Sequence, residues 1–195
     1  MAANLDFRLF TAVNGLAGHS AIADGIGAVA AQYIPLVTAA SLVYLWVTAD
    51  SRSARQRLLL DAYAVLLALL INFLITLVYY HPRPFAAGVG TQLIPHGAET
   101  SFPSDHATVM FAAALMLLAL PGYRKAGGLL TAVAAIGGLL RVFAGVHFPS
   151  DILGSFGVGL AAAGLIFGMR RRLIPVSDRL MGIAEKVRLF PKVDH

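Results

Sequence analysis

The chain contains no cysteine, and only 13% of its 195 residues are charged. The absence of cysteine excludes a disulfide framework and any thiol chemistry. A soluble domain carries about twice that share of charged residues, roughly a quarter. The hydrophobic residues, 58% of the total, lie in long blocks. This pattern predicts an integral membrane protein rather than a soluble one.

The first 24 residues also lack the basic start, the clean apolar core and the cleavage site of a secretory signal. Their apolar side chains favour instead an interfacial N-terminal helix within residues 1–24, lying along the membrane surface.

Five apolar stretches are long enough, or nearly so, to cross about 30 Å of hydrocarbon. They lie near residues 25–48, 58–80, 105–120, 126–146 and 151–169. The third is short, which suits a helix whose outer end lies in a polar cleft. Gly and Ala are frequent in the last two, and small residues let membrane helices pack closely. We therefore expect an all-α polytopic membrane bundle of about five to six transmembrane helices, forming a single domain over residues 1–195.

The basic residues gather on one side of this predicted bundle. Alternation of the spans leaves only Arg8, Arg83 and Arg141, of fifteen Lys and Arg, on the outer face. The others lie in two loops and in a basic tail, residues 170–195. The positive-inside rule makes that face cytoplasmic, in a bacterial plasma membrane. The basic charge is thus explained without a nucleic-acid partner.

The tetrapeptide FPSD occurs twice, at the start of the third and of the fifth stretch. Ser104 and Ser150 are predicted to cap the two helices, with an aspartate in each first turn. The topology directs both helix N-termini at one outer cleft. Such N-termini bind anions, and two arginines, Arg83 and Arg141, lie at the same edge. Together these features predict a phosphate ligand.

Two histidines add groups for phosphoryl transfer. His147 could attack phosphorus through a neutral ring nitrogen, with Asp151, four residues on, as its orienting partner. His106 could protonate the leaving oxygen and later activate water. Histidine and aspartate also ligate zinc, but the nearby arginines would repel a cation. We therefore expect no metal and no cofactor.

Three motifs in this region resemble a known family. They are RP at Arg83, PSDH ending at His106, and R-x5-H-x3-D from Arg141 to Asp151. In this order they resemble the signature motifs of the type 2 phosphatidic acid phosphatase (PAP2) superfamily. The flanking residues are most similar to its bacterial undecaprenyl-diphosphatases.

The resemblance implies metal-independent hydrolysis of a polyprenyl diphosphate lipid through a phosphohistidine. His147 would be the nucleophile, Asp151 its partner and His106 the acid. The implied phosphate-binding groups are Arg83, Ser104, Arg141 and the backbone of Asp105.

The sequence departs from the superfamily pattern at one phosphate contact. A lysine is expected seven residues before the arginine of RP, and Thr76 stands there. Tyr79, Tyr80 and His81 are candidates to replace it.

Five polar residues have more than one interpretation. Asp105 adds negative charge beside an anion, so its side chain is expected to point away or to orient a neighbour. Asn72 and Thr76 either make helix–helix hydrogen bonds, which we favour, or line a deep cleft. His96 and Glu99 either line the entrance of the site or are solvated loop residues.

Two other functions remain open at this point. The same residues would serve a phosphatase of phosphatidylglycerophosphate, phosphatidic acid or another lipid phosphate. A phosphate transporter would need polar groups near the midplane and broken helices in corresponding halves. Here the charges cluster at one edge, which favours an enzyme whose site faces the periplasm or the cell exterior. The oligomeric state is left undetermined.

Overall fold

The computed structural model describes residues 2–186, with the side chains of residues 5–183. This part of the chain folds into helices and connecting loops without a strand. The helices are α1 (Ala2–Asn14), α2 (Ala21–Val47), α3 (Arg52–Val78), α4 (Asp105–Ala119), α5 (Arg124–Phe143) and α6 (Pro149–Lys186). The predicted all-α bundle is confirmed.

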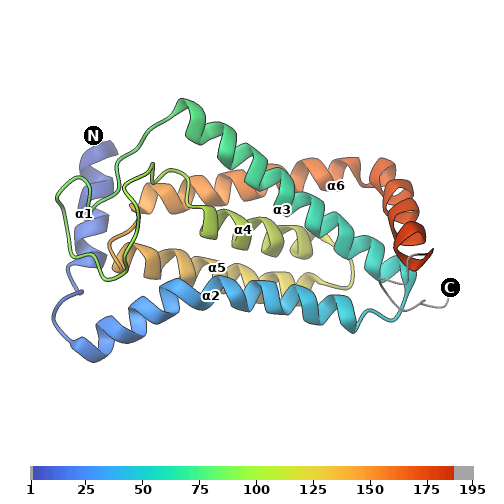
Figure 1. Ribbon diagram of the computed structural model, residues 1–195, viewed down its shortest axis with the longest axis horizontal. Helices are drawn as coiled ribbons and strands as arrows, with labels where there is room; N and C mark the ends of the chain where they lie inside the picture. The colour runs from blue at the N-terminus through green and yellow to red at the C-terminus, as the bar shows by residue number, and fades with distance from the viewer. Residues whose placement is uncertain (1, 187–195) are drawn as a thin grey trace.

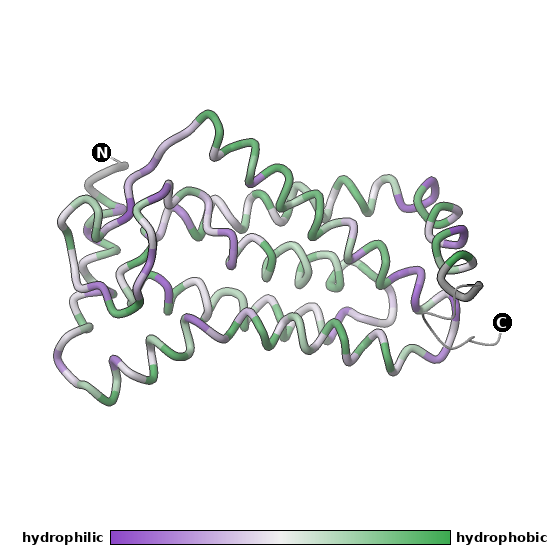
Figure 2. The backbone as a smooth tube through the Cα atoms, viewed as in Figure 1, coloured by the Kyte–Doolittle hydropathy of each residue, from purple (hydrophilic) through white to green (hydrophobic). Residues whose placement is uncertain are grey.

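The helices α2 to α6 form the bundle, and α1 lies across one of its ends (Figure 1). Within the described residues, α2, α3, α5 and α6 are long and apolar enough to cross a membrane. Helix α4 has only 15 residues, or about 22 Å at a rise of about 1.5 Å per residue. Hydrophobic residues run along the middle of the helices, and hydrophilic residues gather at both ends (Figure 2). A multi-pass membrane protein follows from this distribution.

Helix α4 occupies the centre of the bundle, packed against α3, α5 and α6. Close approach depends on glycine at two places. A methyl group at Gly127 of α5 would collide with the backbone of Leu118, and one at Gly159 of α6 would lie 2.8 Å from the backbone nitrogen of Ala112. The small residues of the fourth and fifth stretches therefore do let these helices approach α4 closely, as predicted.

The structure corrects both ends of the predicted organisation. Helix α1 ends at Asn14, and the first span begins at Ala21 after its N-cap Ser20, earlier than expected. The predicted loop-like tail is helical from residue 170 to residue 186, because α6 continues through Pro175. The ribbon turns sharply in this last part (Figure 1), as expected where proline interrupts the hydrogen-bond ladder. Residues 187–195 of the predicted tail lie outside the described part of the chain.

The long helices alternate in direction, which sorts the loops between the two ends of the bundle (Figure 1). Helix α1, the long loop 79–104 and the junction 144–148 between α5 and α6 meet at one end, here called the site end. The turns 48–51 and 120–123 and the end of α6 lie at the opposite end, together with the arginines of residues 52–57 and 170–172.

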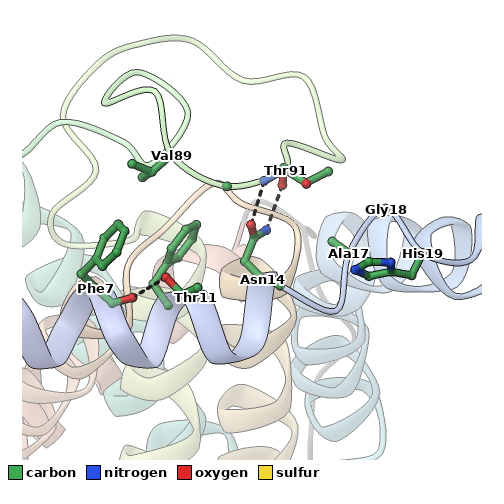
Figure 3. Close-up of a pocket in the computed structure, with 11 residues that line it drawn as sticks. Phe7, Thr11, Asn14, Ala17, Gly18, His19, Val89 and Thr91 are labelled. Atoms are coloured by element: carbon green, nitrogen blue, oxygen red, sulfur yellow. Dashed lines mark hydrogen bonds between the residues drawn. The ribbon is translucent and has the colours of Figure 1, made fainter.

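Asn14, the last residue of α1, fastens that helix to the site end (Figure 3). Its side chain is only 2% exposed. The amide oxygen accepts from the backbone N–H of Thr91 at 2.7 Å, and the amide nitrogen donates to the carbonyls of Thr91 at 2.9 Å and Phe143 at 2.8 Å. One side chain thus joins α1, the long loop and the end of α5.

Candidate active site

The predicted site residues converge at the site end from three segments distant in sequence. Arg83 comes from the long loop and Ser104 from the start of α4. Arg141 lies in the last turn of α5, His147 in the junction 144–148 and Asp151 in the first turn of α6. All five are buried. Burial of so many polar groups at one edge of a membrane bundle is costly, which marks a functional site.

His147 and Asp151 form the expected pair. Asp151 lies in the first turn of α6, and its Oδ2 is 3.3 Å from Nδ1 of His147. The same oxygen accepts the backbone N–H of Phe148 at 2.8 Å. The chain therefore folds back on itself at the start of α6 and holds the carboxylate against the ring.

Arg83 contacts the other side of the imidazole. Its Nη1 lies 3.3 Å from Nε2 of His147 and donates to the carbonyl of Val146 at 3.0 Å. A guanidinium can only donate, so Nε2 must accept and Nδ1 must carry the proton that Asp151 receives. This tautomer leaves the lone pair on Nε2, the atom that would attack phosphorus.

The charge state of His147 fits the same role. Burial lowers the pKa of His147 to about 4, although its hydrogen bond with Asp151 acts in the opposite direction. The imidazole is thus neutral at physiological pH and can act as a nucleophile.

The two arginines retain donors for an anion. The Nε–H groups of Arg83 and Arg141 are buried and have no acceptor among the residues that the structure describes. Arg141 also donates through Nη1 to the carbonyl of Ala31 at 3.3 Å, which fixes its position against α2. Buried donors without acceptors cost free energy, and phosphate oxygens are suitable partners for them.

The start of α4 follows the prediction. Ser104 is the N-cap, and its side-chain oxygen accepts the N–H of Ala107 at 3.5 Å. Asp105 is exposed, and its carboxylate accepts a hydrogen bond from the amide of Asn72, which in turn accepts from Thr108 at 3.0 Å. The predicted α3–α4 hydrogen bond of Asn72 and the orienting contact of Asp105 are both confirmed. The Asp105 side chain is thereby tied to α3, and the helix N-terminus remains available to an anion.

The start of α6 does not follow the prediction. The helix begins at Pro149, so Ser150 lies in its first turn and is not the N-cap. The backbone N–H of Ser150 donates to Asp6 of α1 at 2.8 Å, and its hydroxyl donates to the same carboxylate at 2.6 Å. An acidic side chain of this protein therefore occupies a position at α6 where an anion was expected.

His106 lies in the first turn of α4 and is half-buried. It is close enough to Arg141, His96 and Arg83 for their charges to act on it. His106 therefore lies within electrostatic range of His96 and of both buried arginines.

The long loop adds His96 and Glu99. The ring of His96 lies 6.4 Å from that of His147, and its Nδ1 is 3.1 Å from Oε1 of Glu99. The same oxygen is 3.4 Å from Nη2 of Arg83. Both residues thus lie beside the candidate site residues, which is one of the two alternatives that the sequence left open for them. A loop histidine without helical periodicity carries no signal of its position.

Thr76 and the candidates to replace the lysine lie in distinct environments. Thr76 lines a cavity of about 480 Å³ together with Arg83 and Asp105. Its hydroxyl donates to the carbonyl of Phe73 in its own helix at 2.7 Å, so the helix–helix hydrogen bond predicted for Thr76 is wrong. Tyr79 stacks on His81, with ring centroids 6.2 Å apart, and Tyr80 is 66% exposed. His81 contacts Asp151 directly, with Nδ1 3.0 Å from Oδ1, so it touches the carboxylate that is paired with His147.

Fold and site together define a helical membrane protein with a buried histidine–aspartate pair and two buried arginines at one end. Comparison with known proteins indicates the same class of protein. The PAP2 superfamily model matches residues 57–175. Undecaprenyl-diphosphatase BcrC of Bacillus subtilis is 34% identical over 183 residues, covering 94% of this chain and 93% of that protein. Putative undecaprenyl-diphosphatase YbjG of Escherichia coli is 31% identical over 161 residues, covering 82% of this chain and 80% of that protein.

The crystal structure of Aquifex aeolicus LpxE has the same fold, with a TM-score of 0.69 at 23% identity over 84% of this chain and 95% of that one. This chain belongs to the PAP2 superfamily.

Proposed function

We propose that this protein hydrolyses undecaprenyl diphosphate to undecaprenyl phosphate and inorganic phosphate through a phosphohistidine at His147. One observation supports this most strongly. A buried, neutral His147 donates a hydrogen bond from Nδ1 to Asp151 and has its Nε2 lone pair beside Arg83, in a chain 34% identical to an undecaprenyl-diphosphatase over nearly its whole length.

In the first step, the terminal phosphate binds between Arg83, Arg141 and the N-terminus of α4. Nε2 of His147 forms a bond to the terminal phosphorus, and the bond from that phosphorus to the bridging oxygen breaks. The leaving group is undecaprenyl phosphate, and His106 donates the proton that its oxygen needs. Asp151 stabilises the positive charge that develops on the phosphorylated ring.

In the second step, His106 takes a proton from water, and the water oxygen attacks phosphorus. The phosphorus–nitrogen bond breaks, which releases inorganic phosphate and restores neutral His147. The arginines stabilise the equatorial oxygens in both steps.

The cavity beside Arg83 supports a lipid substrate. Its polar end is lined by Arg83, Glu99 and Thr100, and its apolar end by Leu69 and Phe73 of α3. Phe73 is 58% exposed on a helix long enough to span the membrane. The phosphate group of a lipid would lie against the polar residues of this cavity, and its hydrocarbon chain against Leu69 and Phe73.

We further propose that the site end faces the periplasm or cell exterior in a bacterial plasma membrane, because the arginine-rich loops lie at the opposite end. The chain has no cysteine, so a single introduced cysteine reports its side without background. Ala86→Cys at the site end should react with a membrane-impermeant maleimide in intact cells, and Arg171→Cys should not. The reverse labelling would overturn this orientation.

The activity is tested with purified protein in detergent containing EDTA. Undecaprenyl diphosphate, phosphatidylglycerophosphate and phosphatidic acid are compared, with His147→Ala alongside. We expect the wild-type protein to release inorganic phosphate quickly from undecaprenyl diphosphate, and His147→Ala to lose this activity. Preference for a glycerolipid would overturn the substrate and keep the chemistry. Full activity of His147→Ala would overturn the mechanism.

A further inference from the structure

The Asp151 carboxylate is shared between two histidines. Its Oδ2 contacts Nδ1 of His147 at 3.3 Å, and its Oδ1 contacts Nδ1 of His81 at 3.0 Å. Asp151 has no exposed surface, whereas the side chain of His81 is 25% exposed. The contact to His81 is thus the shorter one, and it reaches Asp151 from the rim of the site.

The proton on His81 can be placed by elimination. An ionised carboxylate only accepts, so Nδ1 of His81 must donate to Asp151. The Ser101 hydroxyl is also 3.0 Å from this nitrogen, and it donates to the carbonyl of Pro82 at 3.4 Å. Ser101 is therefore left as a second acceptor of the same N–H.

The orientation of the His81 ring is fixed by its surroundings. Its backbone N–H donates to the side chain of Thr100 at 3.0 Å, and its carbonyl accepts from the N–H of Ser101 at 2.8 Å. The ring lies between Tyr79 and Phe148, with centroid distances of 6.2 and 5.3 Å. These contacts hold the partly exposed His81 ring in the orientation in which its Nδ1 reaches Asp151.

His81 and Arg83 also act on opposite sides of the same imidazole. His81 reaches Nδ1 of His147 through Asp151, and Arg83 reaches Nε2 directly. The two residues are separated by only Pro82, so one short segment of the long loop controls both nitrogens of the nucleophile.

We propose that His81 is a positioning residue for the nucleophile: it holds the Asp151 carboxylate in the orientation that keeps His147 in its attacking tautomer. The inference rests on the proposed role of His147 as nucleophile. Groups that orient a metal-ligating histidine from one contact away change metal affinity or activity about 10- to 100-fold when removed, and we expect the same range for a nucleophilic histidine.

Two amide substitutions at His81 distinguish the positioning of Asp151 from a role in phosphate binding. The side-chain nitrogen of asparagine can stand where Nδ1 stands, whereas the longer glutamine places its nitrogen nearer to the position of Nε2. We expect His81→Asn to keep kcat within about threefold, and His81→Gln and His81→Ala to lose about 10- to 100-fold. KM and inhibition by inorganic phosphate should stay unchanged, because the arginines that bind phosphate are untouched.

The measurement is single-turnover formation of phosphohistidine from diphosphate labelled at its terminal phosphate, together with steady-state kcat, KM and the phosphate inhibition constant. His19→Gln, an exposed histidine far along the chain from the motifs, serves as the matched control. Thermal unfolding of each variant in detergent reports whether the fold is retained.

Equal losses in His81→Asn and His81→Gln, or KM and phosphate inhibition weakening in step with kcat, would overturn the positioning role. So would a His81→Ala variant as fast as wild type. In those cases His147→Ala still lacks the phosphoenzyme, and the proposed function stands. A wild-type protein that forms no phosphohistidine would overturn both.

Discussion

The negative charge of Asp151 can be removed with little change in shape by the substitution Asp151→Asn. The amide oxygen can still accept from the N–H groups of Phe148 and His147, which now contact Oδ2. The amide NH2 group then faces His81, whose neutral ring can present a lone pair at Nδ1 instead of a proton. The hydrogen-bond pattern survives, so the substitution isolates the effect of the charge.

The size of that effect follows from the geometry. Attack through Nε2 leaves positive charge on the ring of His147, and the carboxylate lies 3.3 Å from Nδ1. Two unit charges about 4 Å apart interact by about 4 kcal/mol at an effective dielectric constant of about 20. If about half of the charge has developed in the transition state, the loss is about 2 kcal/mol. We therefore expect phosphoenzyme formation to slow by about 30-fold, and by about 10³-fold if the charge is fully developed.

The assay is rapid-quench single turnover with diphosphate labelled at its terminal phosphate, stopped in base because phosphohistidine is labile in acid. Asp24→Asn is the matched control, since this half-buried carboxylate in the first turn of α2 accepts hydrogen bonds from the N–H of Gly18 and lies outside the candidate site. It should react at the wild-type rate. A loss below about threefold in Asp151→Asn, less than about 1 kcal/mol, would refute the electrostatic argument.

Three further outcomes are expected. Because burial lowers the pKa of His147 to about 4, protonation of the nucleophile should reduce kcat/KM only as pH falls toward 4; a loss that follows an ordinary histidine near pH 6.5 would contradict this. Asn14→Ala removes three part-buried hydrogen bonds to the backbone of Thr91 and Phe143 and should lower the free energy of unfolding by about 3 kcal/mol. This is measured in detergent against Thr11→Val, whose hydroxyl donates to a carbonyl of its own helix. Gly127→Ala, which forces a methyl group against the backbone of Leu118, should lower the free energy of unfolding by about 1–3 kcal/mol; an unchanged melting temperature would show that the α4–α5 contact is loose.

The sequence predicted the bundle well because spanning helices are governed by a local rule. About twenty apolar residues are needed to cross the hydrocarbon, and charged residues mark where a span ends. The rule failed at α6, where three consecutive arginines suggested the end of the helix. The ladder of backbone hydrogen bonds does not depend on hydropathy, so the helix continues past Arg172 and turns at Pro175.

The convergence of the main candidate residues was also predictable, because each belongs to a short motif whose position on the bundle follows from topology. His81 was predicted only as a candidate to replace a phosphate-binding lysine. Its contact with Asp151, seventy positions away in sequence, was not predicted. No spacing in the sequence distinguishes a histidine that faces a phosphate from one that faces the carboxylate behind the nucleophile.

The contribution of α1 shows most clearly what lies beyond such motifs. Read by itself, this segment is a short amphipathic helix, and nothing in it indicates a role at the site. In the fold, the Asp6 carboxylate accepts hydrogen bonds from the backbone N–H and the hydroxyl of Ser150, close to His147 in the sequence. In the proposed mechanism, this contact keeps the phosphate away from this part of α6 and leaves it the N-terminus of α4 and the free Nε–H groups of Arg83 and Arg141. Nε2 of His147 is in contact with Arg83. In that mechanism, a residue that binds no phosphate thus helps to decide where the phosphate lies.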